Sequence, residues 1–393
     1  MINITLFAQI IQLLNRSEFK TLVNKYQTDK YTKGINTWTH FVSMLFFQFA
    51  HANSLSEISN GLKATSGDLN HLGIQKKVPC KSSLSYINEH RSWEFFRDYY
   101  MSLYKIFTNE GNFKQIKFKI KRKIYLLDST TITLCLSLFD WAKYRTAKGA
   151  IKLHMLLDYD GFLPSFINVT TGKVADVKEA RRISIPANSV VVADRAYEDY
   201  KLLSKWDKSG IKFVIRIKES TGTIGMKENQ LPEGKNEDIL IDEKITLENK
   251  ETREKYPNRL RRVVIYDRKN NNTIILVTNN FTWTARTISE LYKGRWNIEA
   301  FFKMLKQQLK IKTFIGTSLN AVMIQIWTAM TTILLMKYLK QRGKYNWSMS
   351  NLIAFLRMGL FLKLNLQQWL DKPFKPPDEI GEDKLQTKLF EQK

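Results

Sequence analysis

The segments KFKIKRKIYLLD (residues 117–128) and SVVVAD (residues 189–194) decide the fold of this chain. Each contains an apolar, β-branched run that ends in an aspartate, Asp128 in the first and Asp194 in the second. Short runs of this kind are typical of buried strands. We therefore expect two strands that end at these aspartates. If the strands are parallel neighbours, their carboxyl ends form one site.

The sequence around these two runs alternates strand and helix signals. Asp160-Gly161 is a strong hairpin signal between two apolar runs. The runs and the later elements are IKLHMLLDY (151–159), FLPSFINV (162–169), the helical DVKEARRI (176–183) and the strand-like IKFVIRI (211–217). Strands followed by alternating helices and strands predict an α/β core.

The flanking regions suggest further domains. Helical periodicity predicts an all-helical N-terminal domain over residues 1–118, whose short helices between residues 54 and 90 favour DNA binding over a plain helical bundle. The expected remaining parts are a first core segment (119–217), a β-rich insertion (218–284), a second core segment (285–345), and a C-terminal helix with a flexible tail (346–393).

Composition narrows the function. The 393 residues include 62 Lys and Arg against 37 Asp and Glu, a net charge of +25, which indicates a polyanionic partner, usually nucleic acid, or an anionic membrane surface. Two cysteines without metal-type spacing argue against disulfides and a cysteine zinc site, so we expect a cytoplasmic protein. The most apolar window, Ala321–Met336, is too short and polar for a membrane span, and we expect a core helix there.

A polar stripe marks the segment ELYKGRWNIEAFFKMLKQQLK (residues 290–310). The form Thr-x-x-Glu at residues 287–290 predicts a helix start, and the helical pattern runs unbroken past Lys306. On one continuous helix, Tyr292, Arg295, Glu299 and Lys306 fall within an arc of about 60°. On spacing alone, a solvated helix face with an Arg–Glu pair is the favoured explanation of this stripe.

The aspartates at the two strand ends favour a functional role for the polar stripe of residues 292–306. Neighbouring carboxylates raise each other's pKa unless a cation neutralises them. Oxygen ligands suit Mg²⁺, with Mn²⁺ tolerated, and Glu299 is the candidate third ligand beside Asp128 and Asp194. Two ions about 3.5–4 Å apart would activate a water or a 3′-OH and stabilise the leaving oxygen of a phosphodiester.

These residues carry a resemblance. Asp128, Asp194 and Glu299, with the pattern Y-x2-R-x3-E-x6-K that starts at Tyr292, resemble the insertion-sequence-4 family of bacterial DDE transposases. Asp194-Arg195-Ala196-Tyr197 is similar to that family's D-R-G-Y stretch, with Ala196 in place of the usual glycine. The resemblance extends over residues 5–345.

The resemblance implies an RNase H-like catalytic core that is interrupted by the β-rich insertion and preceded by the helical domain. It implies cut-and-paste transposition through a DNA hairpin, in a homodimeric complex with the terminal inverted repeats of the element and with target DNA. By position, Asp128, Asp194 and Glu299 would be the catalytic metal ligands. Tyr292, Arg295 and Lys306 would contact DNA phosphates.

Other candidates have simpler explanations beside a functional one. Lys148 and Lys152 are candidate DNA contacts or solvated edge lysines, and Trp283 is a candidate base-stacking residue or a core residue. His154 reads as a structural histidine. We interpret three carboxylates as structural rather than catalytic. Asp158 and Asp160 flank the hairpin turn, and Asp176 is the expected N-cap of a helix.

Two alternatives to a transposase remain open. One is an RNase H-like nuclease that cuts DNA without joining it. The other is a catalytically inactive DNA-binding repressor, which the presence of all three acidic residues disfavours.

Overall fold

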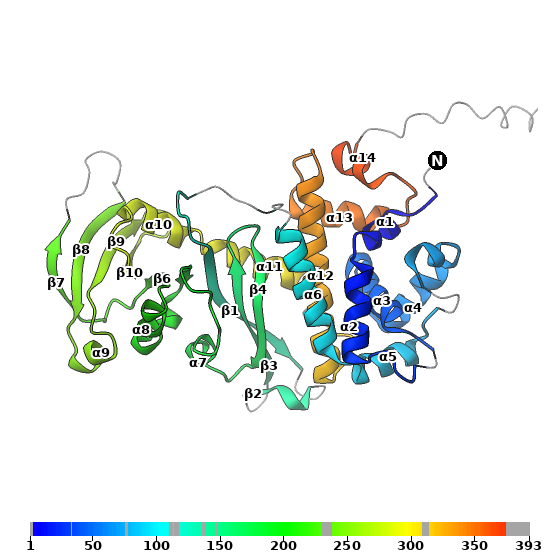
Figure 1. Cartoon of the computed structure of the whole chain (residues 1–393), viewed down its shortest axis with the longest axis horizontal. Helices are drawn as coiled ribbons and strands as arrows, with labels where there is room; N and C mark the ends of the chain where they lie inside the picture. The colour runs from blue at the N-terminus through cyan, green and yellow to red at the C-terminus, as the bar shows by residue number, and fades with distance from the viewer. Residues whose placement is uncertain are drawn as a thin grey trace, which may run out of the picture.

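The N-terminal part of the chain is helical (Figure 1). The structure, a computed structural model, describes residues 3–32, 34–74, 78–109, 113, 118–135, 139–145, 148–229, 238–308 and 314–374. The regular elements described up to residue 109 are α1 (Leu6–Gln12), α2 (Arg16–Tyr26), α3 (Thr37–Ala50), α4 (Leu55–Ala64), the 3-10 helix η1 (Ser66–Leu72), α5 (Lys81–His90) and α6 (Trp93–Asn109).

A mixed α/β region follows. Its first half contains β1 (Ile124–Leu134), η2 (Asp140–Ala142), β2 (Lys143–Arg145), β3 (Lys148–Asp158), β4 (Leu163–Thr171), α7 (Asp176–Ala180), β5 (Val190–Ala193), η3 (Arg195–Tyr197), α8 (Tyr200–Lys208) and β6 (Lys212–Arg216). Its second half contains β7 (Thr223–Glu228), β8 (Ile239–Leu247), α9 (Lys250–Lys255), β9 (Leu260–Asp267), β10 (Asn272–Thr278), α10 (Ala285–Lys293) and α11 (Trp296–Gln308). Three helices complete the described chain: α12 (Leu319–Arg342), α13 (Met349–Gly359) and α14 (Leu366–Asp371).

All described strands belong to one mixed sheet of ten strands, in the order β2-β3-β1-β5-β6-β10-β9-β8-β7, with β4 paired to β3. The pairs β1–β5 and β5–β6 are parallel, and the other pairs are antiparallel. The expected hairpin around Asp160-Gly161 is confirmed, because β3 and β4 pair on either side of it and Gly161 has φ +78°. The strands of the expected β-rich insertion continue the same sheet through the β6–β10 pair.

Helices cover both faces of the central strands (Figure 1). Alternate residues of β1 and β5 enter two separate apolar cores: Leu126 and Val192 face the core shared with α11 and α12, and Leu127 and Ala193 face the core shared with α8. Strands buried on both faces need apolar residues at every position, which explains the unbroken run at the start of β1 and along β5.

The long helix α12 lies against α6 and α3 (Figure 1). It is long and apolar enough to cross a membrane, but 89% of its most apolar window is buried inside the protein. The hydroxyls of Thr328, Thr331 and Thr332 donate to carbonyl groups of the preceding turn, which satisfies them in an apolar setting. The expected buried core helix is therefore confirmed.

The expectation that β1 ends at Asp128 is wrong. The strand continues to Leu134, and its antiparallel pairing with β3 continues with it. Only the parallel pairing with β5 stops, at Leu127 and Ala193. Beyond Asp128 the strand alternates buried and exposed residues, as a strand with one covered face does. The unbroken apolar run therefore stops at Asp128 although the strand does not.

The expected unbroken helix is also wrong. α10 begins after the N-cap Thr284, whose side chain accepts from the Thr287 backbone N–H, and it ends at Lys293. α11 starts at Trp296, and tighter hydrogen bonds join the helices, from Arg295 N–H to the Tyr292 carbonyl and from Ile298 N–H to the Arg295 carbonyl. The break interrupts the single helix that was expected over residues 292–306, although Arg295 still lies near Tyr292 and pairs with Glu299.

Gly294 lies at that junction because a side chain does not fit. A Cβ atom there would lie 2.9 Å from Cε2 of Tyr159 and 3.0 Å from the carbonyl oxygen of Leu291. We expect Gly294→Ala to lower the free energy of unfolding by about 1–3 kcal/mol, the usual result of overpacking. Chemical denaturation measures this loss. Gly67→Ala is the matched control, since nothing lies within 4 Å of that Cβ; equal losses in both variants would refute the steric explanation.

A buried ion pair joins β8 and β9. The Arg261 guanidinium donates to both oxygens of Asp242, from Nε at 2.7 Å and from Nη2 at 2.6 Å, and each residue is 5% exposed. Nη1 of Arg261 also donates to the carbonyl of Trp283, just before α10. Arg261 therefore connects the outer strands to the segment that leads into the α10–α11 pair.

We expect Arg261→Ala to lower the free energy of unfolding by about 3–5 kcal/mol, because it leaves the Asp242 carboxylate buried without its partner. Urea unfolding of the full chain measures the change. Arg268→Ala is the comparison variant, because the Arg268–Asp238 pair is exposed and such pairs contribute less than about 1 kcal/mol. Similar losses for the two variants would contradict this explanation.

Candidate active site

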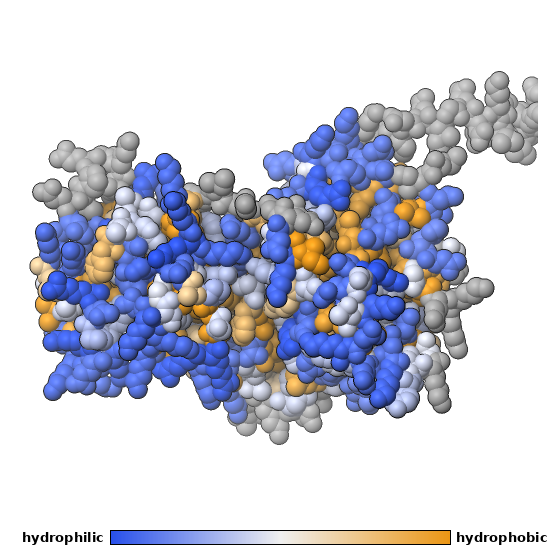
Figure 2. Space-filling view, viewed as in Figure 1, coloured by the Kyte–Doolittle hydropathy of each residue, from blue (hydrophilic) through white to orange (hydrophobic). Residues whose placement is uncertain are grey.

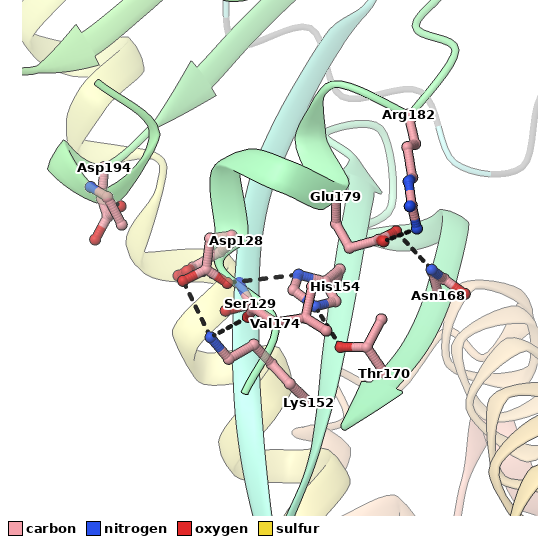
Figure 3. Close-up of polar contacts among 12 residues, drawn as sticks. Asp128, Ser129, Lys152, His154, Asn168, Thr170, Val174, Glu179, Arg182 and Asp194 are labelled. Carbon is pink, nitrogen blue, oxygen red and sulfur yellow. Dashed lines mark hydrogen bonds and ion pairs between the residues drawn. The ribbon is translucent and has the colours of Figure 1, made fainter. Parts of the chain in front are cut away.

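Asp128 and Asp194 lie at the same edge of the parallel part of the sheet, and Figure 3 shows their side chains apart from each other. Leu127 pairs with Ala193, so each aspartate follows the last residue of the parallel pairing. The expectation that the two strands are parallel neighbours is confirmed. The Asp194 carboxylate accepts from the backbone N–H of Ala196 at 2.8 Å, which fixes it at the start of η3.

Arg295 links Asp128 to Glu299. Its Nη1 lies 3.3 Å from Oδ2 of Asp128, and its Nη2 lies 2.7 Å from Oε1 of Glu299. The Arg295 and Asp128 side chains are 10% and 17% exposed, whereas that of Glu299 is 42% exposed. The helix junction at Gly294 thus brings one guanidinium between a strand carboxylate and a helix carboxylate.

The surroundings of Asp128 oppose the ionisation of its carboxyl, mainly because the residue is buried. Burial raises the pKa of the Asp128 carboxyl to about 7, and the negative charges of Asp194 and Glu299 act in the same direction. The backbone N–H of Ser129, which donates to Oδ1 at 2.7 Å, and the Arg295 guanidinium oppose the shift. Among the described contacts, the Arg295 guanidinium is thus shared by two of these three carboxylates, Asp128 and Glu299.

The donor chemistry of this site fits a hard divalent cation, because three carboxylates offer only oxygen ligands. In the protein alone, the positive charge among them is Arg295. Among the described residues, no three His, Cys, Asp or Glu side chains are gathered closely enough to hold a metal ion. Holding one with Asp128, Asp194 and Glu299 thus requires the carboxylates to draw together and Arg295 to give up at least one contact.

Of the other residues of the polar stripe, Tyr292 lies at the junction and Lys306 does not. Tyr292 is 4% exposed, and its ring centre is 5.6 Å from the Arg295 guanidinium carbon. Trp296, which the stripe did not include, is exposed, with its ring 5.8 Å from the same carbon. Lys306 is half-buried near the end of α11. The guanidinium therefore lies near two aromatic rings as well as two carboxylates.

The remaining candidate DNA contacts have structural partners where they are described. Lys152 donates to the carbonyl of Val174 at 3.1 Å and to Asp176 at 3.4 Å. Trp283 is half-buried, and its carbonyl accepts from Arg261. Lys148 begins β3, and its side chain lies outside the described part of the structure. Their roles in DNA binding stay predictions.

The rival carboxylates have other partners. Asp158 accepts from Tyr104 and Lys123, each at 2.7 Å, which joins α6 to β3. The expectation that Asp176 caps α7 is wrong, because the N-cap is Ala175, and Asp176 begins the helix. The Asp176 carboxylate is held by side chains of β3 rather than by the backbone of its own helix.

A polar cluster beside Asp128 was not predicted from the sequence. Lys152 and His154 project from β3 toward the part of β1 that carries Asp128 and Ser129 (Figure 3). Nε2 of His154 lies 2.8 Å from the Thr170 hydroxyl, and Nδ1 lies 3.4 Å from Asp176. Lys152 and His154 occupy alternate positions of β3, and Asp176 lies 22 residues or more away in the sequence, so no local pattern marks this cluster. The β1–β3 register places the two β3 side chains next to Asp128 and Ser129.

The chain matches two protein families. The family described as "Transposase DDE domain" matches residues 119–335, more than half of the chain. A "Domain of unknown function (DUF4372)" matches residues 2–75. The range 119–335 includes Asp128, Asp194 and Glu299.

Two relatives are named transposases. The probable transposase for the insertion sequence element IS5377 of Geobacillus stearothermophilus is 30% identical over 61% of this chain. A Sinorhizobium fredii protein with the provisional name transposase y4zB is 31% identical over 57% of this chain. The chain spans 63% of the length of each of these relatives.

Among solved structures, a piggyBac transposase synaptic complex with hairpin DNA matches 96% of this chain and 83% of that chain, at 12% identity and a TM-score of 0.41. A similarity this low carries no argument. The match over residues 119–335 is the decisive one, because it extends over the sheet and over both helices of the candidate site. The chain therefore belongs to the transposase DDE domain family.

Proposed function

We propose that the chain is the transposase of a bacterial insertion sequence, which cuts DNA at the ends of its element and joins those ends to target DNA. The observation that carries this proposal is the placement of Asp128 and Asp194 on adjacent parallel strands, with Arg295 connecting Asp128 to Glu299. Membership of the transposase DDE domain family and the names of the two relatives support it.

In this proposal, Asp128, Asp194 and Glu299 hold Mg²⁺, with Mn²⁺ as a substitute, and two ions are the expected number. Bound ions of this kind activate an attacking oxygen and stabilise the leaving oxygen of a phosphodiester. Asp128 and Asp194 are fixed by the sheet and by hydrogen bonds from Ser129 and Ala196. Glu299, on the more exposed side, is the ligand that has to move.

Arg295, Tyr292 and Lys306 are the proposed contacts to the DNA phosphates next to the cut. The Arg295 guanidinium is already desolvated, and a desolvated cation interacts strongly with a phosphate. Tyr292 packs beside it and limits the directions in which it can move. We propose that the protein belongs to the insertion-sequence-4 group and that it excises its element through a DNA hairpin.

The wider proposal follows from the charge. A net charge of +25 favours binding to DNA, here the terminal inverted repeats and target DNA, and hydrophilic side chains cover most of the face seen in Figure 2.

We propose an RNase H-like core, DNA binding by the helices before β1, a homodimer in the DNA complex and a cytoplasmic location. Domain boundaries at 118, 217, 284 and 345 stay predictions.

Labelled duplex DNA carrying the ends of the element that encodes the chain tests this function. Incubation with Mg²⁺ should give nicked and then hairpin products, and EDTA should abolish both. A pre-cut end with a free 3′-OH should then join to target DNA. Cutting without joining would favour the nuclease alternative, and specific end binding without any Mg²⁺-dependent cutting would favour the repressor.

A further inference from the structure

A groove runs along α5 in the helical region before β1. One of its walls is α5, and the facing wall is the segment that leads from the end of α2 to the start of α3. Its volume is about 1080 Å³. Because an α-helix rises 1.5 Å per residue, the 10 residues of α5 extend over about 15 Å, which is the axial length of about four nucleotides in one strand of duplex DNA.

The groove is positively charged. Its lining contains Lys30 and Arg91, with His90 beside them, and none of the described residues that line it is an aspartate or a glutamate. Asp29 pairs with Arg91 at 3.8 Å, but it lies outside the lining and accepts two hydrogen bonds from Thr37. A groove with cations and without carboxylates complements an anionic ligand.

Neutral hydrogen-bond donors add to the lining. Ser82 and Ser83 lie in the first turn of α5, whose N-cap, Cys80, makes no side-chain cap hydrogen bond. The first backbone N–H groups of a helix have no partner within the helix. Contacts to DNA phosphates come from Lys and Arg, from hydroxyl side chains and from backbone N–H groups at helix N-termini. The lining of this groove therefore matches a sugar-phosphate backbone.

The Cys80 thiol indicates that this end of the groove stabilises negative charge. Its Sγ lies 3.2 Å from the Ser82 hydroxyl and 3.1 Å from the Ser83 hydroxyl. Hydrogen bonds from Ser82 and Ser83 lower the pKa of the exposed Cys80 thiol to about 6, because they stabilise the thiolate. The same donors are available to a phosphate oxygen.

Two exposed tyrosines also belong to the lining. Tyr31 is 87% exposed and Tyr86 is 63% exposed. The Tyr86 ring stacks on that of His90, with ring centres 4.2 Å apart, and the Lys30 ammonium lies 5.3 Å from the centre of the Tyr31 ring. Tyr31 has φ 59°, a left-handed conformation that bulky residues rarely adopt and that clusters at functional sites. Exposed aromatic rings beside a cationic groove are typical of nucleic-acid binding.

We propose that this groove binds the sugar-phosphate backbone of one strand of duplex DNA at the element ends. Lys30 and the hydroxyls of Ser82 and Ser83 donate to phosphate oxygens. Tyr31 and Tyr86 lie against the sugars of the same strand. The inference rests on the proposed function for the identity of the DNA. Contacts of this kind position a protein on DNA and do not read its sequence.

Alkylation of Cys80 tests the inference in the full chain with Cys135→Ser, which leaves Cys80 as its one cysteine. A thiol with a low pKa reacts readily with iodoacetamide near pH 7. We expect duplex DNA that carries an element end, at about 10 times its Kd, to slow this reaction about 10-fold, since only unbound protein reacts. An unchanged alkylation rate, in a sample whose gel shift shows bound DNA, would overturn the inference.

Lys30→Ala provides the second test. Its affinity for duplex DNA should fall about 10-fold, the lower end of what a hydrogen bond to a charged group contributes. The loss should be the same for element-end and unrelated duplexes, and the slope of log affinity against log salt should fall by about 1. Filter binding over a range of salt concentrations measures both effects.

Lys20→Ala is the matched control, because Lys20 is an exposed lysine of α2 outside the lining of the groove. Its affinity and salt slope should equal those of the unmodified chain. Equal losses in Lys20→Ala and Lys30→Ala, or an unchanged slope in Lys30→Ala, would overturn the inference. If the unmodified chain showed no Mg²⁺-dependent nicking while both groove results held, the proposed function would fail and the groove would stand as a DNA site.

Discussion

Asp128→Asn protein should bind element-end DNA with unchanged affinity and nick it more than about 100-fold more slowly, since removing a ligand should cost more than removing an outer-shell hydrogen bond. Asparagine keeps the shape of the side chain and removes its charge. Binding should survive, because affinity for DNA comes mainly from the basic surface and Asp128 is mostly buried. Gel-shift and nicking assays on the same duplex measure the two effects separately.

Asp160→Asn is the control for Asp128→Asn. Asp160 lies beside the β3–β4 turn and not at the parallel edge of the sheet, so nicking should stay within about twofold of the unmodified chain, since surface changes usually alter stability by less than 0.5 kcal/mol. Asp194→Asn should behave as Asp128→Asn does. Normal Mg²⁺-dependent nicking by either of these two strand-edge variants would refute the ligand assignment.

Arg295→Ala should weaken DNA binding and nicking together. An arginine that stabilises the charge of a transferring phosphoryl group contributes about 1,000-fold or more to the rate, and we expect a loss of that order. If Arg295 neutralises one phosphate, the slope of log affinity against log salt should fall by about 1. Filter binding from low to high salt and single-turnover nicking provide the two measurements.

Arg286→Ala is the control for Arg295→Ala. Arg286 also pairs with a glutamate four residues along the helix, Glu290, but both side chains are exposed. Its nicking rate should be nearly unchanged. An Arg295→Ala protein with the normal salt slope and a reduced rate would show that Arg295 acts on the carboxylates and does not contact a phosphate.

The sequence predicted the sheet edge well because its evidence is local. Unbroken apolar runs before Asp128 and Asp194 follow directly from burial on both faces of the central strands. The Asp160-Gly161 turn has positive φ at Gly161, and the Asp-Gly pair that favours such a turn can be recognised directly in the sequence. The later strands β8, β9 and β10 were likewise visible as β-branched runs between turns.

The errors came from features that depend on neighbours distant in sequence. The break between α10 and α11 has no proline, and one of the two groups that exclude a side chain at Gly294 is the ring of Tyr159, more than a hundred residues earlier. The continuation of β1 past Asp128 is stabilised by its pairing with β3. The Lys152–His154–Asp176 cluster depends on strand register and on the packing of α7, neither of which has a local pattern.

Anomalous diffraction from crystals of the full chain grown with Mn²⁺ measures directly whether three distant acidic residues meet at a metal. The predicted result is a strong anomalous peak at the edge of β1 and β5, within ligand distance of Asp128 and Asp194, with Glu299 turned from Arg295 toward it. A peak that excludes Asp128 and Asp194, or no peak with Glu299 still bound to Arg295 at saturating Mn²⁺, would contradict it.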